Sequence, residues 1–190
     1  MNDAAARPCV FLDRDGTLIE DPGYVHRSED LVLLPGVAAG LGRLKRAGYL
    51  LIVVTNQSGV AHGLYPESAV HAMHARLNQE LGREAAIDAF YYAPYHPEAA
   101  LPEYRRSSEL RKPAIGMFQR ARDEHAIELG RSYMVGDRES DLEFGRRAGL
   151  RPILVRTGHG REHPGAADLA VAEDFSAVVE IILAGSERLG

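Results

Sequence analysis

Two aspartates separated by one residue follow the first apolar run of the chain. Asp13 and Asp15 come directly after Cys9–Leu12, a run that predicts a buried strand, and Gly16 follows them. In an open α/β sheet, ligands bind at the carboxyl ends of the strands. Because side chains alternate along a strand, we expect both carboxylates to point the same way, while Gly16 permits a sharp turn close to a ligand. Such a pair can act as nucleophile and general acid; the alternative is a surface loop that carries two aspartates.

A run of polar residues follows the second apolar run, at residues 55–59. Thr55 offers a hydroxyl group, Asn56 and Gln57 offer side-chain amides, and Ser58 adds a second hydroxyl. Hydroxyl, amide and backbone N–H groups at the end of a strand can surround a phosphoryl oxygen. Taken alone, the same residues could form a polar turn and nothing more.

Lys112 and two further aspartates occupy the starts of predicted helices. Lys112 precedes Pro113, whose fixed φ suits the first turn of a helix. Asp137 and Asp141 follow the apolar run at 132–135. Each has a plain structural alternative, because Lys112 could be a solvated lysine and Asp137 could cap a helix.

Apolar runs typical of buried parallel strands alternate with segments of helical periodicity. This pattern predicts an α/β fold, a Rossmann-like, doubly wound and mostly parallel sheet with helices on both faces. The predicted strands cover residues 9–12, 49–54, 89–92, 132–135 and 152–155, with a weaker edge strand at 169–172. The predicted helices cover residues 36–47, 66–81, 114–125, 139–148 and 175–184. We expect one domain over residues 1–190, without a separate cap, and two long loops at 18–35 and 93–112 that border the site.

Composition narrows the class of protein. The chain has 190 residues, of which 45% are hydrophobic, enough for one substantial core. Its formal net charge of -5 and its lack of a long basic run argue against a broad nucleic-acid interface. The single cysteine, Cys9, favours a reducing compartment, and no segment predicts a membrane span or a secretion signal. We therefore expect a cytoplasmic protein with no nucleic-acid or membrane partner.

In their order along the chain, these groups of polar residues resemble the signature of the haloacid dehalogenase (HAD) superfamily of phosphotransferases, over residues 10–141. The resemblance implies a HAD-like phosphatase that uses Mg²⁺, an ion that prefers oxygen ligands. It implies that Asp13, the backbone carbonyl of Asp15 and Asp137 hold this metal. Asp13 would attack phosphorus to give an aspartyl phosphate, while Asp15 would protonate the leaving oxygen and then activate water.

Three more residues receive roles from the same resemblance. Lys112 and the hydroxyl of Thr55 would stabilise negative charge on the phosphoryl oxygens as the phosphoryl group is transferred. Asp141 would orient Lys112 or a metal-bound water rather than bind the metal directly.

Within the superfamily, the motifs are most similar to the histidinol-phosphate and heptose-bisphosphate phosphatase branch, whose members lack a cap. Segment 21–26 favours the heptose side, which implies a small sugar phosphate substrate and removal of the 7-phosphate of D-glycero-D-manno-heptose 1,7-bisphosphate. This step leads to nucleotide-activated heptose for lipopolysaccharide, capsule or a related glycan. We expect the protein to be a monomer.

Arg111 and Arg138 would face the second phosphate of the substrate. The other residues expected to contact substrate are Arg14, Asp21, Gly23, Tyr24, Asn56, Gln57 and Ser58.

The long loop departs from the pattern of this branch. Many members bind a structural zinc there, through three cysteines and one histidine, but Ala93, Tyr95, Ser108 and Leu110 stand at the four ligand positions here. His96 alone cannot form the closed four-ligand site that structural zinc requires. We therefore predict no structural zinc, and a loop that is either ordered by packing or mobile.

Three alternative functions remain open from the sequence. The same motifs would support hydrolysis of histidinol phosphate. A polynucleotide 3′-phosphatase shares related motifs, although the acidic balance of the chain disfavours it. A non-catalytic phosphosugar-binding protein is the third, but such a protein would not need the second acid, Asp15.

Overall fold

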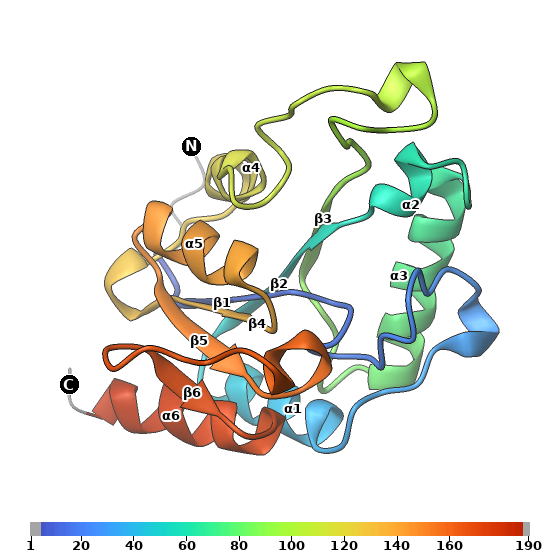
Figure 1. Ribbon diagram of the computed structural model, residues 1–190. Coiled ribbons are helices and arrows are strands. Elements are labelled where there is room, and N and C mark those ends of the chain that lie inside the picture. The colour runs from blue at the N-terminus through green and yellow to red at the C-terminus, as the bar shows by residue number, and fades with distance from the viewer. Residues whose placement is uncertain (1–4, 188–190) are drawn as a thin grey trace.

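The computed structural model describes residues 5–187, which build a six-stranded sheet with helices on both sides (Figure 1). The strands are β1 (Cys9–Leu12), β2 (Leu50–Asn56), β3 (Ala89–Ala93), β4 (Tyr133–Gly136), β5 (Arg151–Val155) and β6 (Ala170–Ala172). They lie in the order β3-β2-β1-β4-β5-β6, and every neighbouring pair is parallel. Because the chain winds outward from β1 in both directions, the carboxyl ends of β1, β2 and β4 surround a topological switch point, the usual ligand site of such sheets.

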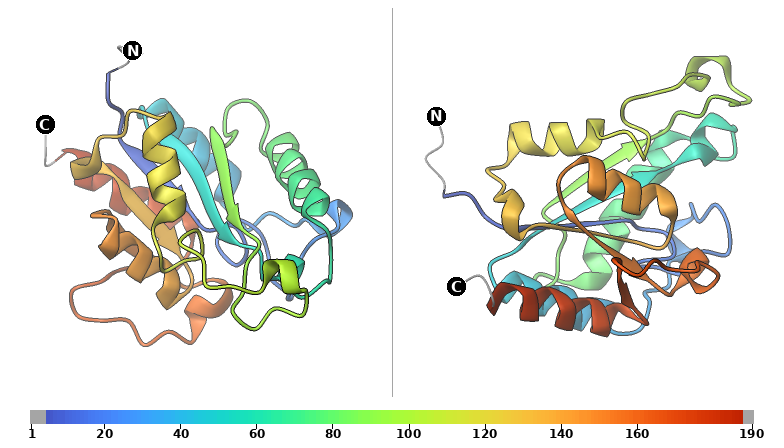
Figure 2. Two further views of the ribbon diagram at one scale, coloured as in Figure 1. Left: turned by 90° about the horizontal axis from the view of Figure 1, so that it is seen from above. Right: turned by 60° about the vertical axis from the view of Figure 1, so that its left-hand side comes forward.

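Helices cover both faces of this sheet. They are α1 (Val37–Arg46), α2 (Ser58–Ala61), α3 (Glu67–Leu81), α4 (Gly116–Glu124), α5 (Glu139–Arg147) and α6 (Phe175–Glu187). Short 3₁₀ turns cover Ser28–Asp30, Pro102–Tyr104, Leu129–Arg131 and Gly158–Arg161. Figure 2 shows α4 and α5, in yellow and orange, on one side of the strands, and α1 and α6, in blue and red, on the other. Side chains of α1, α3 and α6 share one apolar cluster, and those of α4 and α5 share a second.

Strand β1 lies in the middle of the sheet, and this position explains why its sequence is apolar throughout. Val10 and Leu12 belong to the cluster on the α1 side, whereas Cys9 and Phe11 belong to the cluster on the α4 side. Side chains alternate between the two faces, so a strand that is covered on both must be apolar throughout. Apolar burial on both faces therefore fixes β1 and, with it, the position of the acidic residues that follow.

The predicted α/β class, with a parallel sheet and helices on both faces, is confirmed. Most element ends differ from the prediction by one or two residues. β2 continues to Asn56 because Thr55 and Asn56 pair with Tyr92 and Ala93 of β3, so the first two residues of the polar run lie inside the strand. The short helix α2, which begins at Ser58 near the end of this run, was not predicted.

The helix predicted from residue 114 begins instead at Gly116. The backbone after the cis Lys112–Pro113 bond first forms a turn, in which the N–H of Ala114 donates to the carbonyl of Arg111 at 2.9 Å. The N–H of Gly116 donates to the carbonyl of Glu109 at 2.7 Å, which ties the start of α4 back to the loop.

The two long segments border one end of the sheet and form no separate cap within residues 5–187. The loop at 93–112 is attached to α3 by Tyr104, whose hydroxyl donates to the carboxylate of Glu67 at 2.8 Å. The same carboxylate accepts from the hydroxyl of Tyr92, in β3, at 2.5 Å. Its middle is held by the N–H of Leu101, which donates to the carbonyl of Ala61 at 3.0 Å. Across the described part of the chain, no helix combines the length and the apolar character needed to cross a membrane.

Candidate active site

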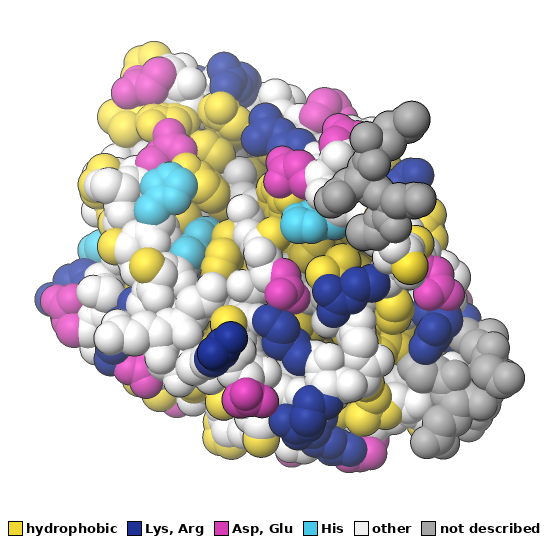
Figure 3. Space-filling view, turned by 180° about the vertical axis from the view of Figure 1, so that it is seen from behind, with side chains coloured by type: hydrophobic (Ala, Val, Ile, Leu, Met, Phe, Trp, Pro, Cys, Tyr) yellow, Lys and Arg dark blue, Asp and Glu magenta, His cyan; other side chains and the backbone are white. Residues whose placement is uncertain are grey.

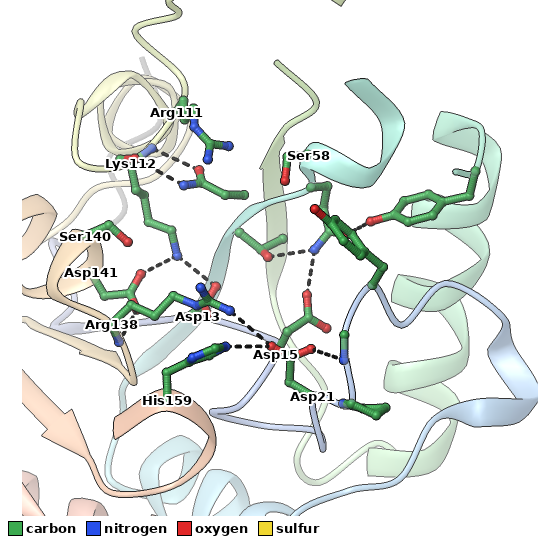
Figure 4. A pocket seen from close by; sticks show the side chains of 17 residues that line it. Asp13, Asp15, Asp21, Ser58, Arg111, Lys112, Arg138, Ser140, Asp141 and His159 are labelled. Atoms are coloured by element: carbon green, nitrogen blue, oxygen red, sulfur yellow. Dashed lines mark hydrogen bonds and ion pairs between the residues drawn. The ribbon is translucent and has the colours of Figure 1, made fainter. Parts of the chain in front are cut away.

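A cavity of about 480 Å³ opens at the carboxyl ends of β1 and β2 (Figure 4). All but two of the predicted site residues line it, namely Asp13, Asp15, Asp21, Gly23, Tyr24, Thr55, Asn56, Gln57, Ser58, Arg111, Lys112, Arg138 and Asp141. The other two, Arg14 and Asp137, are buried just behind the wall, with 1% of each residue exposed. The motifs are therefore brought together from five separate stretches of the chain.

Lys112 lies at the centre of the buried charges. Its Nζ atom donates to Oδ1 of Asp13 at 2.8 Å and to the carbonyl of Val54 at 2.7 Å, and it lies 2.6 Å from Oδ1 of Asp141 (Figure 4). Burial works against the charged form of this lysine, but the carboxylates of Asp13 and Asp141 outweigh burial and raise the pKa of Lys112. The ammonium group therefore stays charged beside Asp13.

Asn56 fixes the backbone that carries this lysine. Its Oδ1 atom accepts from the N–H of Lys112 at 3.0 Å, and its Nδ2 atom donates to the carbonyl of Lys112 at 3.1 Å. The side-chain amide thus pairs with the peptide as a neighbouring strand would. This contact places Asn56 as a support for Lys112, in addition to its place in the cavity wall.

Three carboxylates form a candidate metal centre. Among the described residues, Asp13, Asp137 and Asp141 each offer an oxygen, and these oxygens lie within 4.8 Å of one another. Oδ2 of Asp137 accepts from the N–H of His159 at 2.8 Å, while its buried Oδ1 has no hydrogen-bond partner in the part of the chain that the structure describes. A buried oxygen without a donor is suited to a cation, and hard oxygen ligands suit Mg²⁺.

The local charges agree with this interpretation. Burial raises the pKa of Asp137 to about 8, and the nearby carboxylates of Asp13 and Asp141 add to the rise. Three carboxylates held this closely repel one another, and a divalent cation among them would offset that repulsion. The residues therefore fit the magnesium ion that the sequence predicts.

Asp15 is held by a different set of partners. Nε of Arg14 donates to its Oδ1 at 3.0 Å, Nη2 of Arg14 donates to its Oδ2 at 2.9 Å, and Nε2 of Gln57 donates to its Oδ2 at 2.8 Å. Burial raises the pKa of Asp15; Arg14 opposes this rise and Asp13 adds to it. A raised pKa favours the protonated form of the carboxyl group, which is the form that a general acid needs.

Arg14 is buried and does not line the cavity, although it was expected to contact substrate. Strand β1 ends at Leu12, so the alternation of a strand does not govern the residues after it. The guanidinium group also donates to the carbonyl of Val25 at 3.2 Å and to Oε1 of Gln57 at 3.1 Å. The structure places Arg14 as a buried support behind Asp15.

Charged groups of opposite sign meet at the rim of the cavity. Nη2 of Arg138 lies 3.3 Å from Oδ2 of Asp21, and Nε2 of His159 lies 3.7 Å from the same oxygen (Figure 4). Arg111 stands on another side of the cavity, where its Nη1 atom donates to the carbonyl of Tyr95 at 3.3 Å. The cavity wall thus carries two guanidinium groups besides the buried lysine.

Four residues of the cavity wall were not among the predicted site residues. Pro22 and Ser140 lie between predicted residues, whereas Tyr65 and His159 lie outside the predicted segments. His159 lies between two glycines just beyond the carboxyl end of β5, and that place at a strand end was a usable signal. Its contact with Asp137 is made through the backbone N–H, which no residue type reveals. Tyr65 precedes α3 and carries no motif of its own.

Comparisons with known proteins agree with the site. The D-glycero-D-manno-heptose-1,7-bisphosphate 7-phosphatase of Thermosynechococcus vestitus is 43% identical over 188 residues, which cover 93% of this chain and 95% of that protein. The chain belongs to this family of HAD-like phosphatases. A family model described as HAD-hydrolase-like also matches residues 109–179. The D-glycero-beta-D-manno-heptose-1,7-bisphosphate 7-phosphatase of Escherichia coli K12 is 40% identical over 157 residues, 82% of each chain.

A solved structure of the same family holds the expected metal. The D,D-heptose 1,7-bisphosphate phosphatase from B. bronchiseptica was crystallised in complex with magnesium and phosphate. It superimposes on this chain with a TM-score of 0.81 at 31% identity, covering 94% of this chain and 99% of that one. Together with the three carboxylates here, this complex confirms the expectation of Mg²⁺ as cofactor.

Proposed function

We propose that this chain removes the 7-phosphate of D-glycero-D-manno-heptose 1,7-bisphosphate in a Mg²⁺-dependent reaction. The observation that carries the proposal is the buried contact of Asp13 with Lys112 beside the Asp137 carboxylate, in a chain that matches heptose-bisphosphate phosphatases over most of its length. The product, a heptose 1-phosphate, is the kind of sugar phosphate that nucleotide activation for surface polysaccharide consumes.

In the proposed mechanism, Asp13 is the nucleophile and Asp15 is the acid and base. A carboxylate oxygen of Asp13 forms a bond to phosphorus while the bond from phosphorus to the sugar oxygen breaks. Asp15 gives its proton to that leaving oxygen. Asp15 then takes a proton from water, which attacks phosphorus, releases inorganic phosphate and restores the Asp13 carboxylate. Mg²⁺ held by Asp13, Asp137 and the backbone carbonyl of Asp15 would supply the positive charge that lets two anions approach.

Two side chains would stabilise the transferred phosphoryl group. Lys112 brings a fixed positive charge, which preorganised bonds to Asp13 and Asp141 keep in place. Thr55 accepts a hydrogen bond from Nε2 of Gln57 at 2.9 Å, so its own hydroxyl hydrogen can be donated to a phosphoryl oxygen. Asp141 acts in this scheme by orienting Lys112.

The rim of the cavity offers groups for the rest of the substrate. Arg111 and Arg138 lie outside the buried charge cluster, where they can pair with the 1-phosphate. Asp21, which already pairs with Arg138, can accept from sugar hydroxyls, as can Ser58. Gly23 and the exposed ring of Tyr24 complete this side of the cavity. A bisphosphate would use both positive regions, whereas a monophosphate would use only one.

The face seen in Figure 3 and the net charge disfavour a nucleic-acid substrate. On the face turned away from the viewer of Figure 1, acidic and basic side chains are interspersed without a broad basic area (Figure 3). Strong binding to a polynucleotide depends on many phosphate contacts from clustered lysine and arginine. The net charge of -5 is in keeping with a small substrate.

The proposal is tested by initial rates of phosphate release with Mg²⁺ from a matched panel. The panel contains both anomers of the heptose bisphosphate, histidinol phosphate and a 3′-phosphorylated oligonucleotide. We expect the highest kcat/KM with one heptose anomer and no release by the Asp13→Asn variant. Faster turnover of histidinol phosphate or of the oligonucleotide would contradict the proposal, as would tight binding of the bisphosphate with no turnover.

A further inference from the structure

Tyr65 reaches into the active site from the loop before α3. Its hydroxyl donates to Oε1 of Gln57 at 2.9 Å, and only 6% of the residue is exposed. The ring stacks on that of His26, with centroids 4.8 Å apart and planes 10° from parallel. Gly59 makes room for it, because a methyl group on that glycine would overlap the tyrosine ring. Packing on two sides therefore fixes where the hydroxyl lies.

The hydroxyl helps to set which way the Gln57 amide faces. Oε1 of Gln57 receives hydrogen bonds from Tyr65 and, at 3.1 Å, from Nη2 of Arg14. Its Nε2 atom therefore faces the opposite side, where it donates to Oδ2 of Asp15 at 2.8 Å and to Oγ1 of Thr55 at 2.9 Å. A reversed amide would set its NH₂ group against the guanidinium of Arg14 and its oxygen against the Asp15 carboxylate. The donors that bind the amide oxygen of Gln57 thus favour the orientation in which its NH₂ group donates to Asp15.

We propose that Tyr65 is a positioning residue, which fixes the Gln57 amide and thereby holds the carboxyl group of Asp15 where it protonates the leaving oxygen. The inference rests on the proposed function, because it uses Asp15 as the general acid. Burial raises the pKa of Tyr65 to about 12, so the hydroxyl remains a donor throughout the neutral range. Arg14 shares the same amide oxygen, so removal of the Tyr65 hydroxyl weakens the orientation without abolishing it.

The test uses the dependence of the rate on the leaving group. 4-Nitrophenyl phosphate releases a stabilised anion that needs little help from an acid, whereas phenyl phosphate releases a more basic oxygen. The kcat/KM value reports the steps through formation of the aspartyl phosphate, in which that oxygen leaves. For Tyr65→Phe we expect kcat/KM to fall about tenfold with phenyl phosphate and at most about twofold with 4-nitrophenyl phosphate, as loss of part of a general-acid effect predicts.

Three further variants make the result specific. Tyr91→Phe removes another hydroxyl, one that donates to Glu124 at 2.8 Å outside the cavity, and should leave both rates unchanged. Gln57→Leu breaks the next link and should reproduce the selective loss, which keeps the test valid if Tyr65→Phe folds poorly. Asp15→Asn should show the largest difference between the two aryl phosphates.

Two failures can be told apart. If Asp15→Asn discriminates between the aryl phosphates but Tyr65→Phe and Gln57→Leu slow both equally or neither, the role of Tyr65 is overturned and the proposed function stands. If Asp15→Asn itself slows both equally, Asp15 is not the general acid and the inference is overturned with that assignment. Turnover of the heptose bisphosphate by the wild type is measured alongside and decides the substrate independently.

Discussion

The Nζ atom of Lys112 lies 2.8 Å from Oδ1 of Asp13, although 99 residues separate them in the sequence. Both side chains are almost fully buried, and the same nitrogen also contacts Asp141 and the carbonyl of Val54. The ammonium group therefore has three oxygen partners and neutralises part of an otherwise acidic cluster. This arrangement fixes the charge beside the proposed nucleophile before substrate arrives.

Replacement of this lysine should abolish most activity. In Lys112→Met the fixed charge beside the phosphoryl group is lost, so we expect kcat/KM for the preferred substrate to fall by at least roughly 10²-fold. Lys45, the other lysine of the chain, pairs with Asp88 at 3.0 Å and lies outside the cavity wall. Lys45→Met is thus the matched control and should keep wild-type kinetics. Comparable losses in the two variants would refute a specific role for Lys112.

Gly16 should tolerate no side chain. Its φ of +79° is left-handed, and a methyl group there would overlap Oδ2 of Asp137. For Gly16→Ala we expect a loss of about 1–3 kcal/mol in the free energy of unfolding from backbone strain. Displacement of Asp137 should in addition weaken the apparent affinity for Mg²⁺ by about tenfold or more, as measured from the dependence of rate on Mg²⁺ concentration.

Gly48 provides the control for that experiment. Its φ of +90° is equally left-handed, but nothing lies within 4 Å of the position that a methyl group would take. Gly48→Ala should therefore lose stability with unchanged dependence on Mg²⁺. If both alanine variants kept wild-type Mg²⁺ dependence, the contact between Gly16 and Asp137 would not matter to the metal centre.

His74 should make the fold sensitive to acid. The ring is buried and stacks on Phe90, with centroids 4.4 Å apart. Burial lowers the pKa of His74 to about 3, and the positive charge of Arg14 and the nearby His71 act in the same direction. In the unfolded chain the pKa is about 6.5, so between pH 6.5 and pH 3 only the unfolded state takes up this proton, and stability falls as the pH falls.

Urea unfolding at several pH values measures this effect. Between pH 7 and pH 4.5 the wild type should lose roughly 2 kcal/mol more than His74→Leu, in which the titrating group is absent. His71→Leu, with an exposed histidine replaced one turn earlier in α3, should retain the wild-type dependence. Parallel losses in the wild type and His74→Leu would show that this histidine is not responsible.

Removal of metal should affect activity and not the long loop. The four ligand positions hold Ala93, Tyr95, Ser108 and Leu110, and the hydroxyl of Tyr104 ties the loop to Glu67. We expect EDTA to stop phosphate release, Mg²⁺ alone to restore it, and elemental analysis of protein purified without added metal to find no stoichiometric zinc. One zinc per chain, or a need for zinc to recover activity, would be contrary to this prediction.

The sequence predicts the parts of the site that follow from strand ends. Asp13, Thr55 and Asp137 come after apolar runs, and parallel strands bring such ends to one edge of a sheet. The order of the motifs also identified Lys112. The structure brings this lysine to the site because the helix that follows it packs beside β3 and β2. These residues could be placed together before any coordinates were known.

The remainder depends on contacts that sequence patterns do not encode. Arg14 was expected to contact substrate, but its guanidinium group holds Asp15 and is itself buried. Tyr65 meets Gln57 only because the unpredicted helix α2 places Gly59 beneath its ring. His159 reaches Asp137 through its backbone N–H, which every residue except proline possesses. The predicted metal and nucleophile were thus within reach of sequence reasoning, whereas their supporting groups were not.

The central claim is that Asp13 carries out removal of the 7-phosphate, and ³¹P NMR of the reaction tests it most directly. With the heptose 1,7-bisphosphate and Mg²⁺, the wild type should convert the 7-phosphate signal into inorganic phosphate while the anomeric 1-phosphate signal persists. Asp13→Asn, confirmed as folded by its melting curve, should leave both signals unchanged. Loss of the 1-phosphate signal, or hydrolysis by Asp13→Asn at the wild-type rate, would contradict the account.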